Sequence, residues 1–153
     1  MIVVADTTPL ISLLKISHLD ILQDLYGTVY IPTAVYRELT ENLEFFHESN
    51  LIRNCPFLKI HAGVPSDKVD LLRRATGLDL GESEAIVLAD SNDTKALLID
   101  EAHGRKVAEH MGIPITGTIG VLAAAFRKGF FTSPTLSTVL CQMSKACSNR
   151  SCP

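Results

Sequence analysis

The chain has 153 residues, of which 46% are hydrophobic and 20% are charged. This length suits one domain with a sizeable core, and this balance excludes an intrinsically disordered chain. The net charge of −3 is too small to indicate a general binder of nucleic acids or membranes. No apolar run approaches the ~18 residues of a membrane span, and the N-terminal MIVVADTTPL lacks the basic start of a signal peptide. We therefore expect a cytoplasmic protein without a membrane segment.

Short apolar runs, several of them rich in β-branched residues, alternate with patterns of helical period along the chain. The runs that predict strands are 2–5, 29–31, 58–60, 96–99 and 114–116. The patterns that predict helices begin at Thr7 or Thr8, cover 18–26, run from Thr33 to about 41 and from Ser66 to about 76, cover 82–91, 101–111 and 118–128, and run from Ser133 to about 146. Residues 42–56 are less regular and are expected to form a helix and a loop.

Strands that alternate with helices predict βαβ units and an α/β fold. We expect a three-layer α/β/α sandwich around a parallel sheet of four or five strands. Residues 1–130 carry this pattern, and residues 131–153 are expected to add a C-terminal helix and a polar tail to the same domain. Ligands of such sheets bind at the carboxyl ends of the strands, so the residues that follow the strands are the first functional candidates.

Two acidic residues follow predicted strands directly. Asp6 comes after the strand 2–5 and Asp100 after the strand 96–99. Each of them, taken alone, can simply be a helix N-cap. Together they are expected at one edge of the sheet.

Three glutamates add to this pair. Glu38 lies at the edge of the apolar stripe of its helix, where an unpaired carboxylate is costly unless a cation or a salt bridge compensates it. Glu82 and Glu84 open the helix 82–91, where the helix dipole also favours acids. Because they are two residues apart, they point about 200° apart, so only one of them is expected to face a shared site.

Carboxylates that converge on one point raise each other's pKa values and need a proton or a cation to stay together. Hard oxygen ligands suit Mg²⁺ or Mn²⁺ rather than zinc, and the four cysteines lack the close pairs of a zinc site. A metal held in this way can activate water and stabilise a departing oxyanion. The acids therefore point to phosphoryl chemistry.

Several short motifs, in this order and at this spacing, resemble the PIN-domain family from residue 1 to about 130. They are Asp6-Thr7-Thr8-Pro9-Leu10, Tyr36-Arg37-Glu38-Leu39, Gly81-Glu82-Ser83-Glu84-Ala85 and Leu98-Ile99-Asp100. A prokaryotic subgroup similar to VapC-like toxins is resembled in Leu98-Ile99-Asp100-Glu101, Arg105-Lys106-Val107-Ala108 and Gly117-Thr118-Ile119-Gly120-Val121-Leu122.

The resemblance implies an α/β/α fold and a metal-dependent ribonuclease. Its Mg²⁺ or Mn²⁺ would be bound by Asp6, Glu38, Glu84 and Asp100, with Thr7 orienting Asp6 or a metal-bound water. Glu84 is preferred because the family's acid directly precedes an Ala-apolar-apolar run, and Glu82 is the second choice. Arg105 or Lys106 would contact phosphate; the alternative is that both are exposed basic residues of a helix.

The same resemblance implies RNA as the substrate, a homodimer, and a small antitoxin protein as the partner of a toxin. An alternative from another class is a non-catalytic scaffold that binds a protein or nucleic acid and uses the acids to hold one structural ion. A haloacid-dehalogenase-like phosphatase is disfavoured because position 8 is Thr8 rather than a second aspartate. A receiver domain is disfavoured because the first and last predicted strands lack its acids and its lysine.

Overall fold

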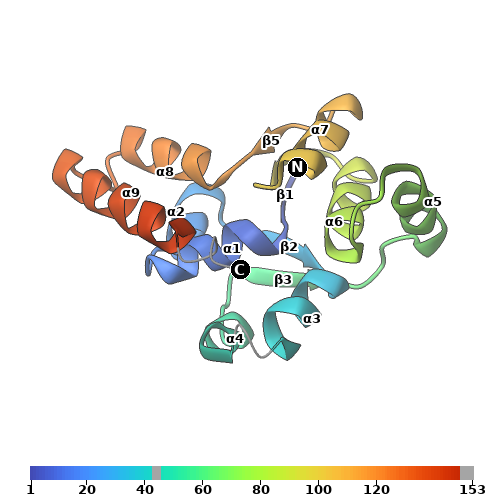
Figure 1. The fold of residues 1–153 in the computed structure, drawn as a ribbon, viewed down its shortest axis with the longest axis horizontal. Coiled ribbons are helices and arrows are strands. Elements are labelled where there is room, and N and C mark those ends of the chain that lie inside the picture. Colours follow the sequence, from blue (N-terminus) through green and yellow to red (C-terminus); the bar gives the residue numbers. More distant parts are fainter. Residues whose placement is uncertain (43–45, 149–153) are drawn as a thin grey trace.

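In a computed structural model, which describes residues 1–42 and 46–148, five parallel strands form one sheet (Figure 1). The strand order is β3-β2-β1-β4-β5. Central β1 pairs with β2 through Val4 and Tyr30 and with β4 through Val4 and Leu97. The parallel sheet predicted from the sequence is thus confirmed. The strands are β1 (Ile2–Ala5), β2 (Val29–Pro32), β3 (Leu58–His61), β4 (Thr94–Leu98) and β5 (Ile115–Thr116).

Helices connect the strands and continue beyond the last one. None of those within the described residues is long and apolar enough to cross a bilayer. They are α1 (Thr7–Lys15), α2 (Ile21–Tyr26), α3 (Thr33–Glu41), α4 (Phe46–Arg53), α5 (Ser66–Thr76), α6 (Leu80–Asp90), α7 (Ala102–His110), α8 (Thr118–Arg127) and α9 (Ser133–Ser148).

The sheet divides the apolar core into two layers because successive side chains of a strand point to opposite faces. Val3 and Ala5 pack in one layer, with side chains from α1, α2, α3, α4, α8 and α9. Val4 packs in the other, with side chains from α5, α6 and α7. The result is the predicted three-layer α/β/α sandwich.

Several element boundaries differ from prediction, and two of these differences have a clear local reason. Helix α6 begins at Leu80 rather than at residue 82, because Asp79 forms a capping box with Glu82. Thr33 is the first residue of α3 rather than its cap, since Pro32 occupies that position. Strand β4 ends at Leu98, one residue earlier than expected. Residues 43–45 of the irregular segment and 149–153 of the polar tail lie outside the described residues.

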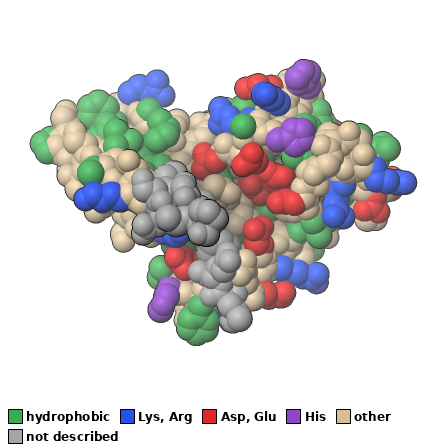
Figure 2. Space-filling model, in the orientation of Figure 1, with side chains coloured by type: hydrophobic (Ala, Val, Ile, Leu, Met, Phe, Trp, Pro, Cys, Tyr) green, Lys and Arg blue, Asp and Glu red, His purple; other side chains and the backbone are tan. Residues whose placement is uncertain are grey.

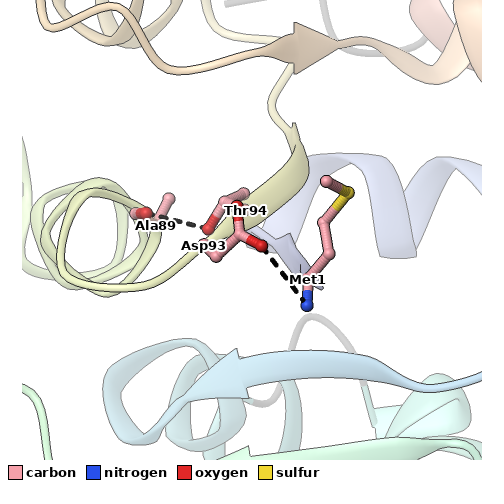
Figure 3. A network of polar contacts seen from close by, with 4 residues as sticks. All are labelled: Met1, Ala89, Asp93 and Thr94. Atoms are coloured by element: carbon pink, nitrogen blue, oxygen red, sulfur yellow. Dashed lines mark hydrogen bonds and ion pairs between the residues drawn. The ribbon is translucent and has the colours of Figure 1, made fainter.

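The amino ends of the central strands are fastened by polar contacts (Figure 3). The N-terminal amine of Met1 lies 3.7 Å from a carboxylate oxygen of Asp93. The hydroxyl of Thr94 donates to the carbonyl of Ala89 at 2.8 Å, which joins the end of α6 to the start of β4. These two contacts therefore join the N-terminus and the end of α6 to the start of β4.

Candidate active site

Acidic side chains gather at the opposite, carboxyl edge of the sheet, and red atoms fill the middle of the face seen in Figure 2. Asp6 follows β1, and Asp100 lies two residues beyond the end of β4. The Asp6 amide donates to the carbonyl of Leu98 at 2.9 Å, so the two strand ends are adjacent there. Helices α3 and α6 pack against each other and carry the glutamates to the same edge.

Asp6 is the most deeply buried of these acids, with 4% of its surface exposed. It occupies the N-cap position of α1, but its side chain makes no capping hydrogen bond. The pKa of Asp6 is raised to about 7, chiefly by burial, and the backbone amide of Thr7 opposes this shift. The charges of Glu82, Asp79 and Glu38, in that order, contribute to the same rise. An N-cap role alone therefore does not account for Asp6.

Glu82 takes part in the capping box of α6 and also acts on Asp6 through its charge. Its side chain accepts from the Asp79 amide at 3.3 Å, while Asp79 accepts from the Glu82 amide at 2.8 Å. Burial, followed by the charge of Asp79, raises the pKa of Glu82. A Cβ atom at Gly104 would lie 3.5 Å from a Glu82 oxygen, so the first turn of α7 packs beside this carboxylate. Asp79 is not among the residues predicted above; the signal for it is its capping-box spacing to Glu82.

Glu38 receives a hydrogen bond from the first residue of α1. The Thr7 hydroxyl, which is buried, donates to Glu38 Oε2 at 2.7 Å. The family resemblance implied that the Thr7 hydroxyl orients Asp6 or a metal-bound water, whereas the structure shows this hydroxyl donating to Glu38. The bond links α1 to α3 across the site and fixes one oxygen of Glu38.

Glu84 is turned to a different partner from Glu82. Its Oε2 accepts from the backbone amide of Ala34 at 2.9 Å, in the first turn of α3. This carboxylate supplies the capping acceptor that Pro32 cannot offer. Glu84 and Glu38 both line a cavity of about 330 Å³, together with Arg37. Of the two acids that open α6, Glu82 is the one whose charge acts on Asp6.

Asp100 is held by the start of α8. Its Oδ1 accepts from the Thr118 amide at 2.7 Å, and its Oδ2 accepts from the Thr118 hydroxyl at 2.5 Å. The N-cap position of α8 is Gly117, which has no side chain to offer. A Cβ atom there would lie 2.8 Å from Asp100 Oδ1, which is closer than real contacts allow. The glycine therefore makes room for this distant cap.

The two basic candidates lie differently on α7. Arg105 is half-buried, and its Nη1 donates to the Ile99 carbonyl at 3.0 Å, one residue before Asp100. Lys106 is exposed. The structure thus brings Arg105, but not Lys106, against the end of β4.

The fit of this edge to a divalent cation rests on its donor atoms and their charge. Within residues 1–42 and 46–148, no three Asp, Glu, His or Cys side chains already form a cluster that could hold a metal. Oxygens of Glu38, Glu84 and Asp100 are instead engaged by N–H and O–H donors. Asp6 is different, because it is buried and the charges acting on it are negative. Carboxylate oxygens around an uncompensated acid suit Mg²⁺ or Mn²⁺.

A family model described as a PIN domain matches residues 2–151. The chain belongs to the PIN-domain family. PIN domains are generally nucleases and typically use divalent metal ions, so membership supports a nuclease-type function for this chain. No significant match was found among curated proteins or among solved structures.

Proposed function

We propose that this PIN domain is a metal-dependent endoribonuclease whose reaction takes place at the carboxyl edge of the sheet. The observation that carries the proposal is the environment of Asp6. Its carboxylate is buried, its pKa is raised to about 7, and its charged neighbours are acids. A cation in this position would offset the repulsion and the desolvation together.

The metal ligands proposed are Asp6, Glu38, Glu82 and Asp100. Glu82 is proposed in place of Glu84, which the family resemblance favoured, because the charge of Glu82 acts on Asp6 while Glu84 caps α3. When bound, Mg²⁺ or Mn²⁺ would act as a Lewis acid that activates water and neutralises charge developing on the leaving oxygen.

The chain's own residues hold this arrangement in place. Thr7 fixes one oxygen of Glu38, and Thr118 fixes both oxygens of Asp100 through its amide and hydroxyl. Burial keeps Asp6 away from bulk water and strengthens electrostatic interactions with any bound cation. Preorganised carboxylates need not be reordered when the substrate arrives, and this lowers the barrier.

The proposal includes RNA as the substrate and a role as the toxin of a toxin–antitoxin pair. Support for this part comes from the motifs Leu98-Ile99-Asp100-Glu101 and Gly117-Thr118-Ile119-Gly120-Val121-Leu122, which resemble VapC-like toxins. A homodimer and a small antitoxin protein that masks the nuclease belong to the same proposal.

The test is Mn²⁺ binding by calorimetry, followed by cleavage of mixed-sequence single-stranded RNA in Mg²⁺, Mn²⁺ and EDTA. Wild type is compared with Asp6→Asn, and Asp93→Asn serves as the matched control at the other end of the sheet. We expect binding and cleavage in wild type and in the control, and neither in Asp6→Asn. Wild type that binds no Mn²⁺ and cleaves no RNA would overturn the proposal and favour a non-catalytic scaffold.

A further inference from the structure

Arg105 of α7 lies against the end of β4, and its positive charge has no role in the metal site proposed above. Arg105 is half-buried, and its guanidinium lies beside the loop that carries Asp100. An arginine in such a place loses hydration, and a paired carboxylate is the usual compensation. Within the described residues, the one ion pair present joins Met1 to Asp93, so Arg105 has no carboxylate partner.

A backbone contact holds the guanidinium in position. Nη1 donates to the Ile99 carbonyl at 3.0 Å, which fixes the side chain at the last residue before Asp100. Arginine has five N–H donors in a planar fork, and this bond uses one of them. The remaining donors are suited to a planar or tetrahedral oxyanion such as a phosphate.

Asp100 is close to Arg105 but is satisfied by other groups. A Cβ atom at Gly117 would lie 2.8 Å from Asp100 Oδ1 and 2.9 Å from Arg105 Nη1. Both atoms therefore border the space that a methyl group at position 117 would fill. The Asp100 oxygens accept from Thr118, so the carboxylate attracts the guanidinium without forming an ion pair with it.

We propose that Arg105 binds a backbone phosphate of the nucleic-acid substrate directly beside Asp100. This inference rests on the proposed nuclease function, because it places the phosphate next to the carboxylates that would hold the metal. The guanidinium supplies positive charge that a mostly acidic edge needs to accept a polyanion. Gly117 keeps open the space between Arg105 and Asp100.

The test measures binding apart from cleavage. The probe is a fluorescein-labelled, mixed-sequence single-stranded RNA, titrated by anisotropy at several KCl concentrations. Ca²⁺ replaces Mg²⁺, since its larger and more irregular coordination shell makes it a poor substitute in an octahedral site. The proteins are wild type, Arg105→Gln, Arg105→Lys, and Arg127→Gln as the matched control. Arg127 is exposed in the last turn of α8, at the opposite end of that helix from Thr118.

We expect Arg105→Gln to weaken RNA binding about tenfold and to lower the salt slope by roughly 0.7 to 1, the value for one lost phosphate contact. Arg105→Lys keeps the charge but loses the planar fork of donors, so its RNA affinity falls between that of wild type and that of Arg105→Gln. Arg127→Gln binds as wild type does. Calorimetric Mn²⁺ affinity in Arg105→Gln stays the same or rises, because a cation has been removed from beside Asp100.

Three outcomes overturn the inference. The first is that Arg105→Gln keeps the RNA affinity and salt slope of wild type. The second is that Arg127→Gln loses as much RNA affinity as Arg105→Gln does. The third is that Arg105→Gln loses Mn²⁺ binding, which would mean that the arginine only positions Asp100. If Arg105→Gln unfolds below the assay temperature, Arg105→Lys provides the test. Wild-type RNA affinity in Arg105→Lys would then contradict the proposed role of the guanidinium. RNA binding that needs Arg105, without any cleavage in Mg²⁺ or Mn²⁺, would uphold the phosphate site and overturn the nuclease proposal alone.

Discussion

The charged groups at the two ends of the parallel sheet lie in opposite environments. At the amino end, Asp93 lies beside the N-terminal amine of Met1, and both are largely exposed. At the carboxyl end, Asp6 is buried among other acids, and its pKa is raised to about 7. The first arrangement stabilises the fold a little, whereas the second costs free energy. A residue that lowers the stability of the folded protein in this way is characteristic of a functional site.

The carboxyl end itself contains two kinds of acid. Glu84 and Asp100 accept backbone N–H groups at the starts of α3 and α8, so they stabilise the fold. The carboxyl group of Asp6 is destabilised in its charged form, and so is that of Glu82, although Glu82 also takes part in a capping box. Asp6 and Glu82 therefore carry charge that no cation offsets, whereas Asp100 stabilises a helix and still has lone pairs on both oxygens with which it can bind a metal.

The largest expected effect comes from Asp6→Asn, which removes the buried charge and keeps the shape. Metal-dependent RNA cleavage should fall about a thousandfold or more, because a ligand of the proposed metal is lost. Without metal at pH 8 the variant should melt at a higher temperature than wild type, because no buried carboxylate has to ionise. A fully active, well-folded Asp6→Asn protein would contradict the assignment of Asp6.

The second effect separates the two glutamates that open α6. Glu82→Gln should reduce cleavage about a hundredfold or more, since Glu82 is the acid whose charge acts on Asp6. Glu84→Gln keeps an oxygen that can accept from the Ala34 amide, so it should change cleavage only a few-fold. Initial rates at saturating Mn²⁺ measure the difference. Large loss in Glu84→Gln with none in Glu82→Gln would reverse the assignment.

The sequence predicted the framework well because the framework follows local patterns. Apolar runs such as Ile2–Ala5 and turn residues such as Gly27 and Gly77 specify their own structure, and both glycines adopt positive φ at helix ends. The family motifs predicted acids at the carboxyl edge, with Glu84 preferred to Glu82. Asp6 and Asp100 follow strands that end there, and Glu38 and Glu84 lie on helices that reach it.

The partners of those acids were not predictable, because they depend on contacts between residues far apart in the chain. The bond from Ala34 to Glu84 spans 50 residues, and the bond from Thr7 to Glu38 spans 31. The spacing of Glu82 and Glu84 showed that they diverge, but not which of them faces Asp6. That choice is made when α6 packs against α3 and β1.

A smaller effect is the pH dependence that the pKa of Asp6 implies. Because the folded-state pKa is above the unfolded value of 3.8, protein without metal loses stability as the pH rises from about 4 to about 7. Metal binding has the opposite dependence, since it requires the ionised carboxylate. Mn²⁺ affinity should therefore fall about tenfold per pH unit below 7 in wild type. Calorimetry at pH 5.5, 6.5 and 7.5 checks this, and an equal affinity at all three would contradict the role of Asp6.

The smallest effect is expected at the amino end of the sheet, in Asp93→Asn. The Met1–Asp93 pair is separated by 3.7 Å with side chains 59% and 79% exposed, so solvent screens it strongly. Such a pair contributes roughly 0 to 1 kcal/mol, and the melting temperature should fall by a few degrees at most. Raising the salt concentration should erase even this difference. RNA cleavage should equal that of wild type, because the pair lies at the end of the sheet away from Asp6. A large loss of cleavage in Asp93→Asn would show that the two ends are coupled, and would remove the basis for treating the carboxyl edge as a separate site.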